Sequence, residues 1–581
     1  MNFLRNPFKI AYQGKPYPNY WDLVALFFVL SLIGLLAWNA KQMAVPYELG
    51  QSLPISLDPH HLPVYALRTV SRMLIALVFS LLFTFTVATM AAKNKRAERI
   101  IIPMIDILQS VPILGFLSIA VVGFIALFPG SLLGPECAVI FVLFTSQAWN
   151  MALGFYQTVR SVPAELKEAA NMFHLSAWQR FWRIEVPFSL PGLLWNTMMS
   201  MSAGWFFVVF CEAITVNDQQ ILLPGVGSYI TVAIKAADMH AIGYAILTMF
   251  IVILIYDQVL FRPLVSWAEK FRAEHVAEDD QEMRSWLVNL LHRTRFLRYL
   301  GQQITYLFDA FVNISFLRSK PETSATVFRA ARYERIFIWS WNSFLILAFL
   351  AALIFLGRFI QQNVPLASVK QVFDLGLITA LRVFILIILC SLVWVPVGVW
   401  IGLRPRAAQM IQPIAQFLAA FPANLLYPLV VILIVKYHLN VNIWVTPLMI
   451  LGAQWYILFN VVAGASLLPK ELLHVVNNLG LNLSLRWRRL ILPGIFPYYI
   501  TGAITAAGGA WNASIAAEVV SWGDKKLVAT GLGAYITEYT RVGDFVHVAL
   551  GIGMMCLLVL IFNRLLWRPL YVLAETRFQL D

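Results

Sequence analysis

The sequence predicts an all-α, polytopic membrane protein of about twelve transmembrane helices, arranged as two parallel six-helix repeats. Its 581 residues are 60% apolar and only 13% charged, and the mean hydropathy of +0.73 excludes an ordinary soluble protein. Apolar runs long enough to cross a bilayer recur along the whole chain. A polar segment at 161–191 occurs a second time at 467–497. An internal repeat of this length sets the architecture.

The two copies of the polar segment keep one register. Glu165 matches Glu471 at an interval of 306 residues (471 − 165). The same interval relates Pro163 to Pro469, Arg180 to Arg486, Pro187 to Pro493, Trp205 to Trp511, Glu212 to Glu518 and Gly225 to Gly531. Earlier in each half, Pro112 and Pro422 are 310 apart (422 − 112), so the first copy holds extra residues in an outer loop, where length variation is tolerated best.

We expect six spans in each half. In the first half they lie near 23–37, 65–92, 103–128, 137–156, 191–216 and 242–261. In the second half they lie near 336–357, 371–403, 411–435, 442–465, 497–520 and 545–567. The first apolar run has the outline of a signal peptide, but Asp22 interrupts the basic-to-apolar junction and no clear cleavage site follows. We therefore interpret it as a retained span.

Lysine and arginine residues concentrate in alternate loops. The loop at 93–99 and the polar segment at 161–191 are basic, whereas the loop at 129–136 holds no Lys or Arg. The positive-inside rule then places both termini in the cytoplasm. An even number of spans in each half makes the repeats parallel, with a pathway expected between them. The net charge of +13 reflects this orientation, and we expect no nucleic-acid partner.

The predicted units are 1–264, a cytoplasmic connector at 265–335, and 336–581. Within the connector, the stretch 283–300 mixes apolar and arginine residues in the pattern of a basic amphipathic helix. Such a helix either lies in the membrane interface or packs on the cytoplasmic face of the protein itself, and the sequence favours neither.

The chain carries no predicted catalytic or metal site. Its cysteines lie in or beside apolar runs without CxxC spacing, which is typical of packing residues; they are Cys137, Cys211, Cys390 and Cys556. No phosphate-binding GxxxxGK[ST] motif is present, since Gly14-Lys15 is followed by Pro16. We expect no cofactor in this chain and do not expect it to be an enzyme.

The duplicated polar segment predicts a helix–turn–helix on the cytoplasmic surface. Its first helix should end near His174, or near Gly480 in the second copy, in a left-handed turn. Ser176 and Gln179 have the spacing of a capping box for a second short helix, which Pro187 is expected to stop. Two such projections would dock a symmetric soluble partner. The alternative is a polar loop that only caps the helix bundle.

This segment resembles the EAA loop of ABC importer permeases: Glu-Ala-Ala, three residues, Gly, nine residues, then Ile-x-Leu-Pro. The first copy opens on Glu168-Ala169-Ala170 with His174 at the glycine position, whereas the second keeps Gly480 but has His474-Val475-Val476 in place of Glu-Ala-Ala. The ATPase-coupling residues that the resemblance implies are Glu165, Glu168, Ala169, Ala170, His174, Arg180 and Pro187 in the first copy and Glu471, His474, Gly480, Arg486 and Pro493 in the second.

The stretches 510–519 and 530–536 narrow the resemblance to permeases of the nitrate/sulfonate/taurine group. The resemblance implies a type I importer in the inner (plasma) membrane, with two ABC ATPase subunits on the cytoplasmic side that bind ATP and Mg²⁺. It also implies a periplasmic or extracellular solute-binding protein and a small solute, for example an anion such as nitrate or a sulfonate. Most such permeases are separate subunits that dimerise, whereas this chain is similar to two of them fused.

Polar and aromatic residues within the spans are candidates for the pathway or gate, because ionisable side chains are costly in a bilayer. These candidates are Trp205, Glu212, Trp511, Asn512 and Glu518. For the two glutamates we favour an alternative, in which each braces the Gly-x-Gly loop at the outer interface. Arg72 and Arg382, 310 apart (382 − 72), are expected near a helix end, with side chains that snorkel to the interface.

Two other protein classes stay open as alternatives. A secondary transporter with parallel repeats would use an ion gradient, and it predicts charged or unwound sites in the middle of the membrane. A membrane-embedded enzyme would need a catalytic cluster such as HExxH, which the sequence lacks. The sparse charges within the spans and the paired cytoplasmic segments favour the importer.

Overall fold

The computed structural model of the protein describes residues 53–109, 111–216, 219–268, 295–313 and 364–577, with scattered residues of 27–47 and 340–362. The expected spans near 23–37 and 336–357 lie largely outside these residues. So does the connector, apart from a helix that ends at Val312.

In the first half, helices make up almost the whole described chain. The second expected span comprises η1 (Pro59–His61), α2 (Leu62–Phe83), η2 (Thr84–Ala88) and α3 (Thr89–Lys93). It is followed by α4 (Lys95–Gln109), α5 (Ile113–Leu127), α6 (Leu133–Arg160), α7 (Ala164–Met172), α8 (Ala177–Arg180), η3 (Phe181–Glu185) and α9 (Val186–Cys211). The half closes with strands β1 (Ala213–Val216) and β2 (Gln219–Leu222), then α10 (Val226–Lys235), α11 (Met239–Tyr256), η4 (Asp257–Phe261) and α12 (Arg262–Ala268).

The second half repeats this order after the connector helix α14 (Arg295–Val312). Its membrane helices begin with α16 (Leu366–Gly402), α17 (Pro405–Ala420), η8 (Ala423–Leu426), α18 (Tyr427–Lys436), α19 (Val441–Trp444), η9 (Thr446–Met449) and α20 (Gln454–Ser466). Then follow α21 (Lys470–Asn478), α22 (Leu483–Arg486), η10 (Trp487–Ile491), α23 (Leu492–Ala517), β3 (Val519–Trp522), β4 (Lys525–Val528), α24 (Leu532–Val542), α25 (Phe545–Phe562), η11 (Asn563–Trp567) and α26 (Arg568–Arg577).

The described residues contain seven helices long and apolar enough to cross a membrane, or ten spans if each of three bent helix pairs counts as one. Ten is the number expected for this part of the chain. Three expected spans are not straight helices, however, because α4 and α5 meet at 99°, the two parts of 406–436 meet at 76°, and Val441–Met449 meets Gln454–Ser466 at 44°. Pro112 and Pro422 cap the second parts of the first two pairs, and a proline disfavours helical backbone in the residue before it.

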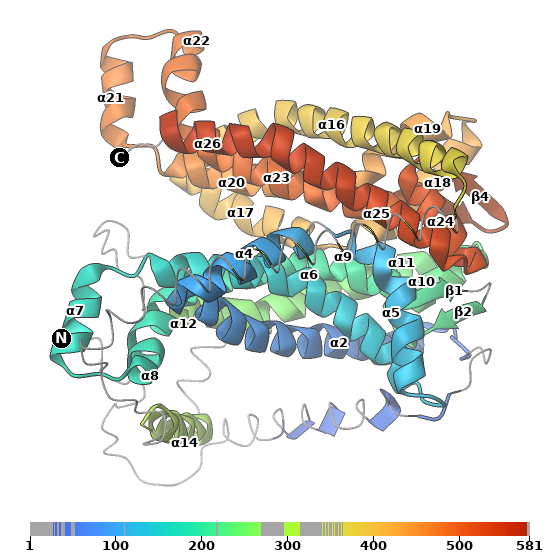
Figure 1. The fold of residues 1–581 in the computed structure, drawn as a ribbon, viewed down its shortest axis with the longest axis horizontal. Helices are drawn as coiled ribbons and strands as arrows, with labels where there is room; N and C mark the ends of the chain where they lie inside the picture. The colour runs from blue at the N-terminus through green and yellow to red at the C-terminus, as the bar shows by residue number, and fades with distance from the viewer. Residues whose placement is uncertain are drawn as a thin grey trace.

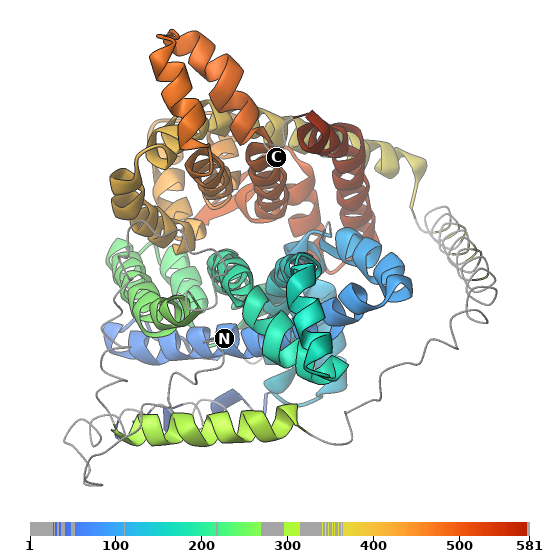
Figure 2. The same cartoon turned by 90° about the vertical axis from the view of Figure 1, so that its left-hand side faces the viewer.

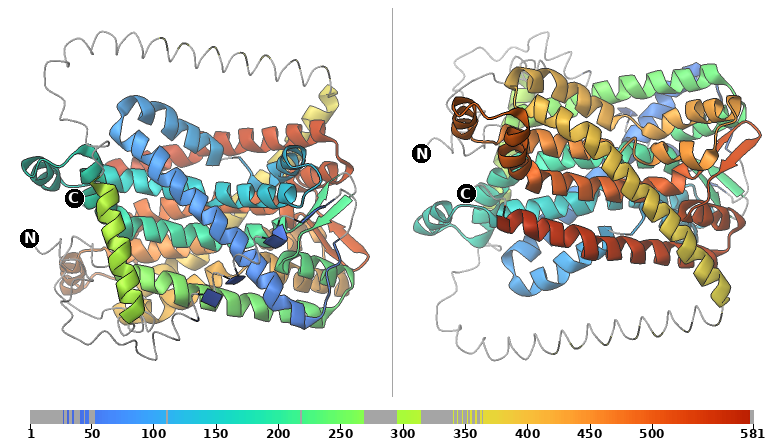
Figure 3. Two further views of the ribbon diagram at one scale, coloured as in Figure 1. Left: turned by 90° about the horizontal axis from the view of Figure 1, so that it is seen from below. Right: turned by 90° about the horizontal axis from the view of Figure 1, so that it is seen from above.

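The halves lie side by side, and the long axes of their spans are roughly aligned (Figures 1 and 3). The loops α7–α8 and α21–α22 project from the same end of the molecule, and both β-hairpins lie at the opposite end. Within each half, the fourth and fifth spans pack closely together, α6 on α9 and α20 on α23. This arrangement is the parallel repeat that the register predicted.

Two short hairpins are the exception to an all-helical chain. Strands β1 and β2 pair antiparallel after α9, as do β3 and β4 after α23. The second hairpin reaches across to the first half, where the backbone N–H of Gly523 donates to the carbonyl of Ile234 at 2.9 Å. The hairpin end of the molecule is therefore linked between halves by backbone contacts.

The expectation that Pro187 ends a short helix is wrong. The helical segment runs without interruption from Ala177 to Cys211, over 35 residues. A π-helical turn at η3 precedes the proline, which occupies the first turn of α9. The wider turn changes the hydrogen-bond pattern where the N–H of Pro187 is missing. The second part of the polar loop and the fifth span therefore form one continuous helical segment, and Leu483–Ala517 repeats it.

Candidate functional site

The two loops that the sequence predicts to couple to an ATPase, called the coupling loops below, are α7–α8 and α21–α22. Each turns at the residue where the sequence predicted a left-handed backbone. His174 has φ of 51° and Gly480 has φ of 60°. Ser176 Oγ accepts a hydrogen bond from the backbone N–H of Gln179, and Gln179 Oε1 accepts one from the backbone N–H of Ser176, completing the capping box. In the second copy, Asn482 caps α22 by accepting from the N–H of Leu485 at 2.9 Å. The two loops reach one shape with different capping residues.

The first coupling loop presents an apolar tip beside acidic residues. Ala170 is buried, whereas Glu165 and Glu168 are exposed. Met172 and Phe173, at the end of α7, are 80% and 64% exposed. Large exposed apolar side chains with a polar surround are typical of a protein interface.

The second loop also exposes apolar side chains, from Val475 and Leu479. Glu471, His474 and Gly480 are exposed as well. Both copies therefore offer a mixed apolar and polar surface at the same end of the molecule.

Ion pairs hold the base of the first loop. The carboxylate of Glu185, which is 5% exposed, lies 3.0 Å from Lys93 Nζ and 3.2 Å from Arg180 Nε. The Lys93 ammonium also lies 4.8 Å from the centre of the Phe181 ring. By the repeat register, Leu403 and Ile491 stand at the positions of Lys93 and Glu185 in the second half (403 − 93 = 310; 491 − 185 = 306). The charged anchor is thus specific to the first copy.

The connector helix α14 packs on the same loop. Trp178 Nε1 donates to the carbonyl of Phe311 at 3.2 Å, and Trp182 makes edge-to-face contacts with Phe308 and Phe311 at 5.8 and 5.6 Å. The helix runs across the ends of the spans (Figure 2).

Of the amphipathic helix expected at 283–300, only 295–300 lies within the described residues, and the described helix continues to Val312. Phe308 and Phe311 of this helix pack on the first loop, while Tyr306 and Leu307 are 71% and 65% exposed.

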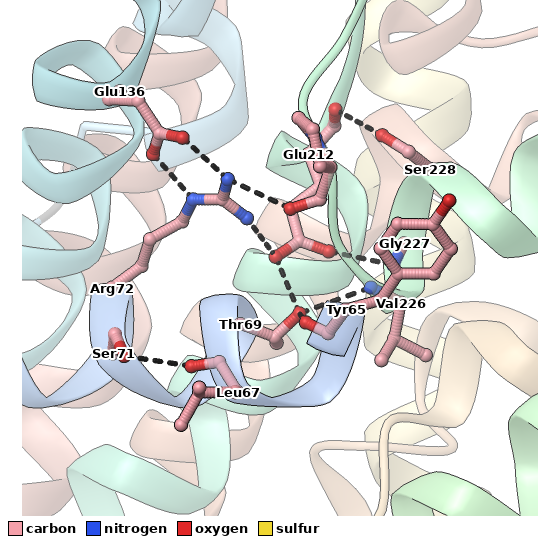
Figure 4. Close-up of polar contacts among 11 residues, drawn as sticks. Tyr65, Leu67, Thr69, Ser71, Arg72, Glu136, Glu212, Val226, Gly227 and Ser228 are labelled. Atoms are coloured by element: carbon pink, nitrogen blue, oxygen red, sulfur yellow. Dashed lines mark hydrogen bonds and ion pairs between the residues drawn. The ribbon is translucent and has the colours of Figure 1, made fainter. Parts of the chain in front are cut away.

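A buried ion cluster lies near the hairpin end of the first half (Figure 4). Arg72 binds Glu136 through two hydrogen bonds, Nε to Oε2 at 2.6 Å and Nη2 to Oε1 at 2.7 Å. Its Nη1 donates to Glu212 Oε1 at 2.6 Å. Arg72 and Glu212 are fully buried. The expectation that Arg72 snorkels to the interface is wrong, because two carboxylates satisfy the guanidinium inside the protein.

The second carboxylate oxygen of Glu212 binds the loop that follows the hairpin. The backbone N–H of Gly227 donates to Oε2 at 2.7 Å, and Thr69 donates to Oε1 at 2.7 Å. A Cβ at Gly225 would overlap the carboxylate, so the loop needs a glycine there. Glu212 thereby links α2 to the start of α10, the geometry expected if it braces the Gly-x-Gly loop.

The second half repeats this cluster with one change. Glu518 accepts from Thr379 at 2.9 Å, from Arg382 at 3.2 Å and from the N–H of Ala534 at 3.0 Å. Asn442 stands at the position of Glu136 (442 − 136 = 306) and accepts from Arg382 Nη2 at 3.0 Å. The sequence analysis missed Glu136 and Asn442, although the 306-residue register would have paired them.

The remaining pathway candidates separate in the structure. Trp205 packs edge-to-face on Tyr256 at 5.6 Å and lines a cavity of about 30 Å³ between the halves. The same cavity is bounded by Phe417 of α17. Trp511 instead packs on Phe562 within the second half, at 6.3 Å. Asn512 crosses between the halves, since its Oδ1 accepts from the backbone N–H of Ile113 at 2.5 Å.

A sequence model of the family described as "Binding-protein-dependent transport system inner membrane component" matches the chain twice, at 65–260 and 394–568. The chain belongs to this family. Because the same model matches two separate segments, one polypeptide carries two copies of the family's unit. The matched segments contain both coupling loops, and the second also covers Glu518 and Asn442.

Curated relatives of this inner membrane component include the bicarbonate transport system permease protein CmpB of Synechococcus elongatus, 29% identical over 29% of this chain and 59% of CmpB. The glycine betaine/proline betaine transport system permease protein ProW of Escherichia coli is 25% identical over 43% of this chain and 65% of ProW. The nitrate import permease protein NrtB of Leptolyngbya laminosa is 26% identical over 32% of this chain and 62% of NrtB. The chain spans about 60% of the length of these relatives.

Proposed function

We propose that this chain supplies both permease units of an ATP-driven importer for a small solute. The observation that carries the proposal is the pair of coupling loops, which project from one end of the molecule while the chain itself has no phosphate-binding motif. Two separate ATPase subunits, which hold ATP and Mg²⁺, bind at 165–187 and 471–493. Both termini lie on that cytoplasmic side of the inner membrane, and a solute-binding protein docks at the hairpin end.

The continuous helices supply the mechanical link. Ala177–Cys211 and Leu483–Ala517 each extend over 35 residues from a coupling loop through the membrane. A helix rises about 1.5 Å per residue, so each is roughly 50 Å long and transmits a movement of the loop along its whole length. When the ATPases close, they move both loops and the halves rock about the pathway between them. The role of this chain is mechanical, without covalent chemistry.

The solute class is proposed from the relatives. CmpB and NrtB are named for bicarbonate and nitrate, which are small anions, and ProW is named for betaines, which are zwitterions. We propose a small solute, with an inorganic anion or a sulfonate as the first class to test. Radiolabelled bicarbonate, nitrate, taurine and glycine betaine are suitable probes.

Purification of the tagged full-length chain from its own membrane tests the proposal. We expect an ATPase subunit to co-purify, and we expect the chain stripped of that subunit to hydrolyse no ATP. Uptake of the accepted probe should stop when ATP is depleted and persist when a protonophore collapses the proton gradient. Robust ATP hydrolysis by the chain alone would overturn the proposal, as would uptake that follows the ion gradient and ignores ATP.

A further inference from the structure

Two asparagine side chains cross between the halves. Asn512 of α23 accepts a hydrogen bond from the backbone N–H of Ile113, the first residue of α5, at 2.5 Å. Asn424 of η8 donates from Nδ2 to the carbonyl of Phe206 on α9 at 3.2 Å. In both contacts, the segment after the break in a bent span is joined to the fifth span of the opposite half. The fifth span of each half is thus hydrogen-bonded to the bent span of the other half.

The internal repeat relates these contacts. Phe206 corresponds to Asn512 (512 − 206 = 306), and Ile113 corresponds to Ala423, the neighbour of Asn424 (423 − 113 = 310). The same two places in the fold are therefore joined twice, with the bent span as donor and the fifth span as acceptor each time, but the side chain and the backbone exchange roles. The fifth span supplies a side-chain acceptor at Asn512 and a backbone acceptor at Phe206. The bent span supplies a backbone donor at Ile113 and a side-chain donor at Asn424.

The contacts lie toward the hairpin end of the pathway. Asn512 and Phe206 each precede the end of their helix by five residues (517 − 512 and 211 − 206), or about 7.5 Å at 1.5 Å per residue. The cavity between the halves extends deeper, since its α9 lining runs from Trp205 to Met198, which precede the end of the helix by six and thirteen residues (211 − 205 and 211 − 198), or roughly 9 and 20 Å. An entry route from the hairpin end to this cavity must pass the level of both contacts.

We propose that the Asn512–Ile113 and Asn424–Phe206 hydrogen bonds are a pair of latches that close the pathway on its outer side. The inference rests on the proposed permease function and its orientation. Both bonds join backbone of one half to a side chain of the other, so neither survives when the halves separate. The Oδ1 atom of Asn424 is buried and has no hydrogen-bond partner among the described residues. The second latch therefore uses only its donor.

The exchange of side-chain and backbone roles gives the proposal a distinctive signature, because the asparagine is the acceptor in one contact and the donor in the other. Aspartate at position 512 keeps the acceptor for Ile113 N–H, and its charge faces the positive end of the α5 dipole. Aspartate at position 424 removes the donor and sets a carboxylate against the Phe206 carbonyl, which is repulsive. The same chemical change should leave one latch closed and open the other.

A thiol reporter in the cavity measures this difference without substrate or ATP. Ser202→Cys is introduced into the full-length chain, and right-side-out membrane vesicles are treated with the impermeant cation methanethiosulfonate ethyltrimethylammonium. The labelling rate is the increment over the same chain without Ser202→Cys, which removes the contribution of the native cysteines. Asn460→Asp serves as the matched control, because the Asn460 amide is half-buried and donates to Tyr456 within its own helix.

We expect Asn424→Asp, Asn424→Ala and Asn512→Leu each to raise the labelling rate about fivefold, the effect of losing one intramolecular hydrogen bond. Asn512→Asp and Asn460→Asp should stay close to the parent rate. Equal rates for Asn424→Asp and Asn512→Asp would overturn the proposal, and so would an unchanged rate for Asn424→Ala. Since labelling needs no ATPase, a failed latch is distinguishable from a failed permease assignment, which the co-purification decides.

Discussion

The two coupling loops have one shape but different supports. The first is anchored by Glu185 between Lys93 and Arg180 and is covered on one side by α14 through Trp178 and Trp182. The second has Ile491 at the position of Glu185 and projects away from the helix bundle (Figure 2). In a fused chain, the two copies of a unit can diverge, because the connector comes after the first copy in the sequence and its helix α14 packs on the loop of that copy.

The ion clusters at the hairpin end show the same divergence. Arg72 faces two carboxylates and is completely buried. Arg382 faces one carboxylate and Asn442, and its side chain is 11% exposed. Charges that are buried without full compensation are costly. The stability of the first half should therefore depend more on Arg72 than the stability of the second half depends on Arg382.

The largest effect that we expect is the loss of Arg72. Arg72→Leu leaves Glu136 and Glu212 buried without their cation, and breaking a buried ion pair costs about 3–5 kcal/mol. Arg382→Leu should cost less, because Asn442 is neutral and the site is partly hydrated. The measurement is the thermal unfolding midpoint of each variant in detergent, together with its level in the membrane. Equal destabilisation by the two substitutions would show that the clusters are energetically equivalent.

The next largest effect concerns Glu518. Glu518→Leu leaves the N–H of Ala534 and the hydroxyl of Thr379 without an acceptor, at roughly 1–3 kcal/mol for each buried donor. Glu518→Gln keeps an acceptor and loses only the charge-assisted part, so it should retain much of the transport activity.

Uptake and membrane level of both Glu518 variants decide between a brace and a substrate contact. If Glu518→Gln abolishes uptake while expression and ATPase binding are normal, Glu518 contacts the solute and is not simply a brace. Glu212→Gln should be tolerated better than Glu518→Gln, because Arg72 would still pair with Glu136, whereas Arg382 would keep only the neutral Asn442.

A smaller effect should follow when the anchor of the first loop is changed to resemble the second. Lys93→Leu combined with Glu185→Ile reproduces the residues at 403 and 491. The Lys93 side chain is 29% exposed, so the stability loss should be at most about 1 kcal/mol. Hydrogen exchange of α7 and α8 should rise toward the rates of α21 and α22. If α7 and α8 exchange as slowly as before, α14 rather than the ion pairs holds the loop.

The sequence predicted the architecture because the repeat is a long-range constraint. The interval between Glu165 and Glu471 placed two loops on one face, and the local turn chemistry at His174 and Gly480 gave their shape. Hydropathy averages over a span, so it could not reveal the breaks before Ile113 and Ala423. At Pro187 the error was the opposite one: the sequence predicted a break, but a π-helical turn keeps the helix continuous there.

The functional contacts were less accessible to sequence reasoning. The register paired Arg72 with Arg382 but carried no information on depth, so the buried carboxylates around Arg72 were not foreseen. Asn512 was a candidate by its polarity alone. Its partner Ile113 lies in the other half, and such a contact follows from the packing of two units rather than from any local pattern.

The smallest effect that we expect is a pH response confined to the second half. Hydrogen bonds from Lys526 and Arg541 hold the pKa of Glu538 below its ordinary value of 4.5, whereas the register places Val232 at the equivalent position of the first half (538 − 232 = 306). A carboxylate with a depressed pKa stabilises the fold above the unfolded pKa, and this contribution is lost as the pH falls through the lower folded value. The pairs are exposed, so the hydrogen-exchange protection factors of β3 and β4, which correct for the pH dependence of intrinsic exchange, should fall only about two- to threefold below pH 4. Glu538→Gln should abolish this fall and leave β1 and β2 unchanged; an equal acid response in both hairpins would assign it to other groups.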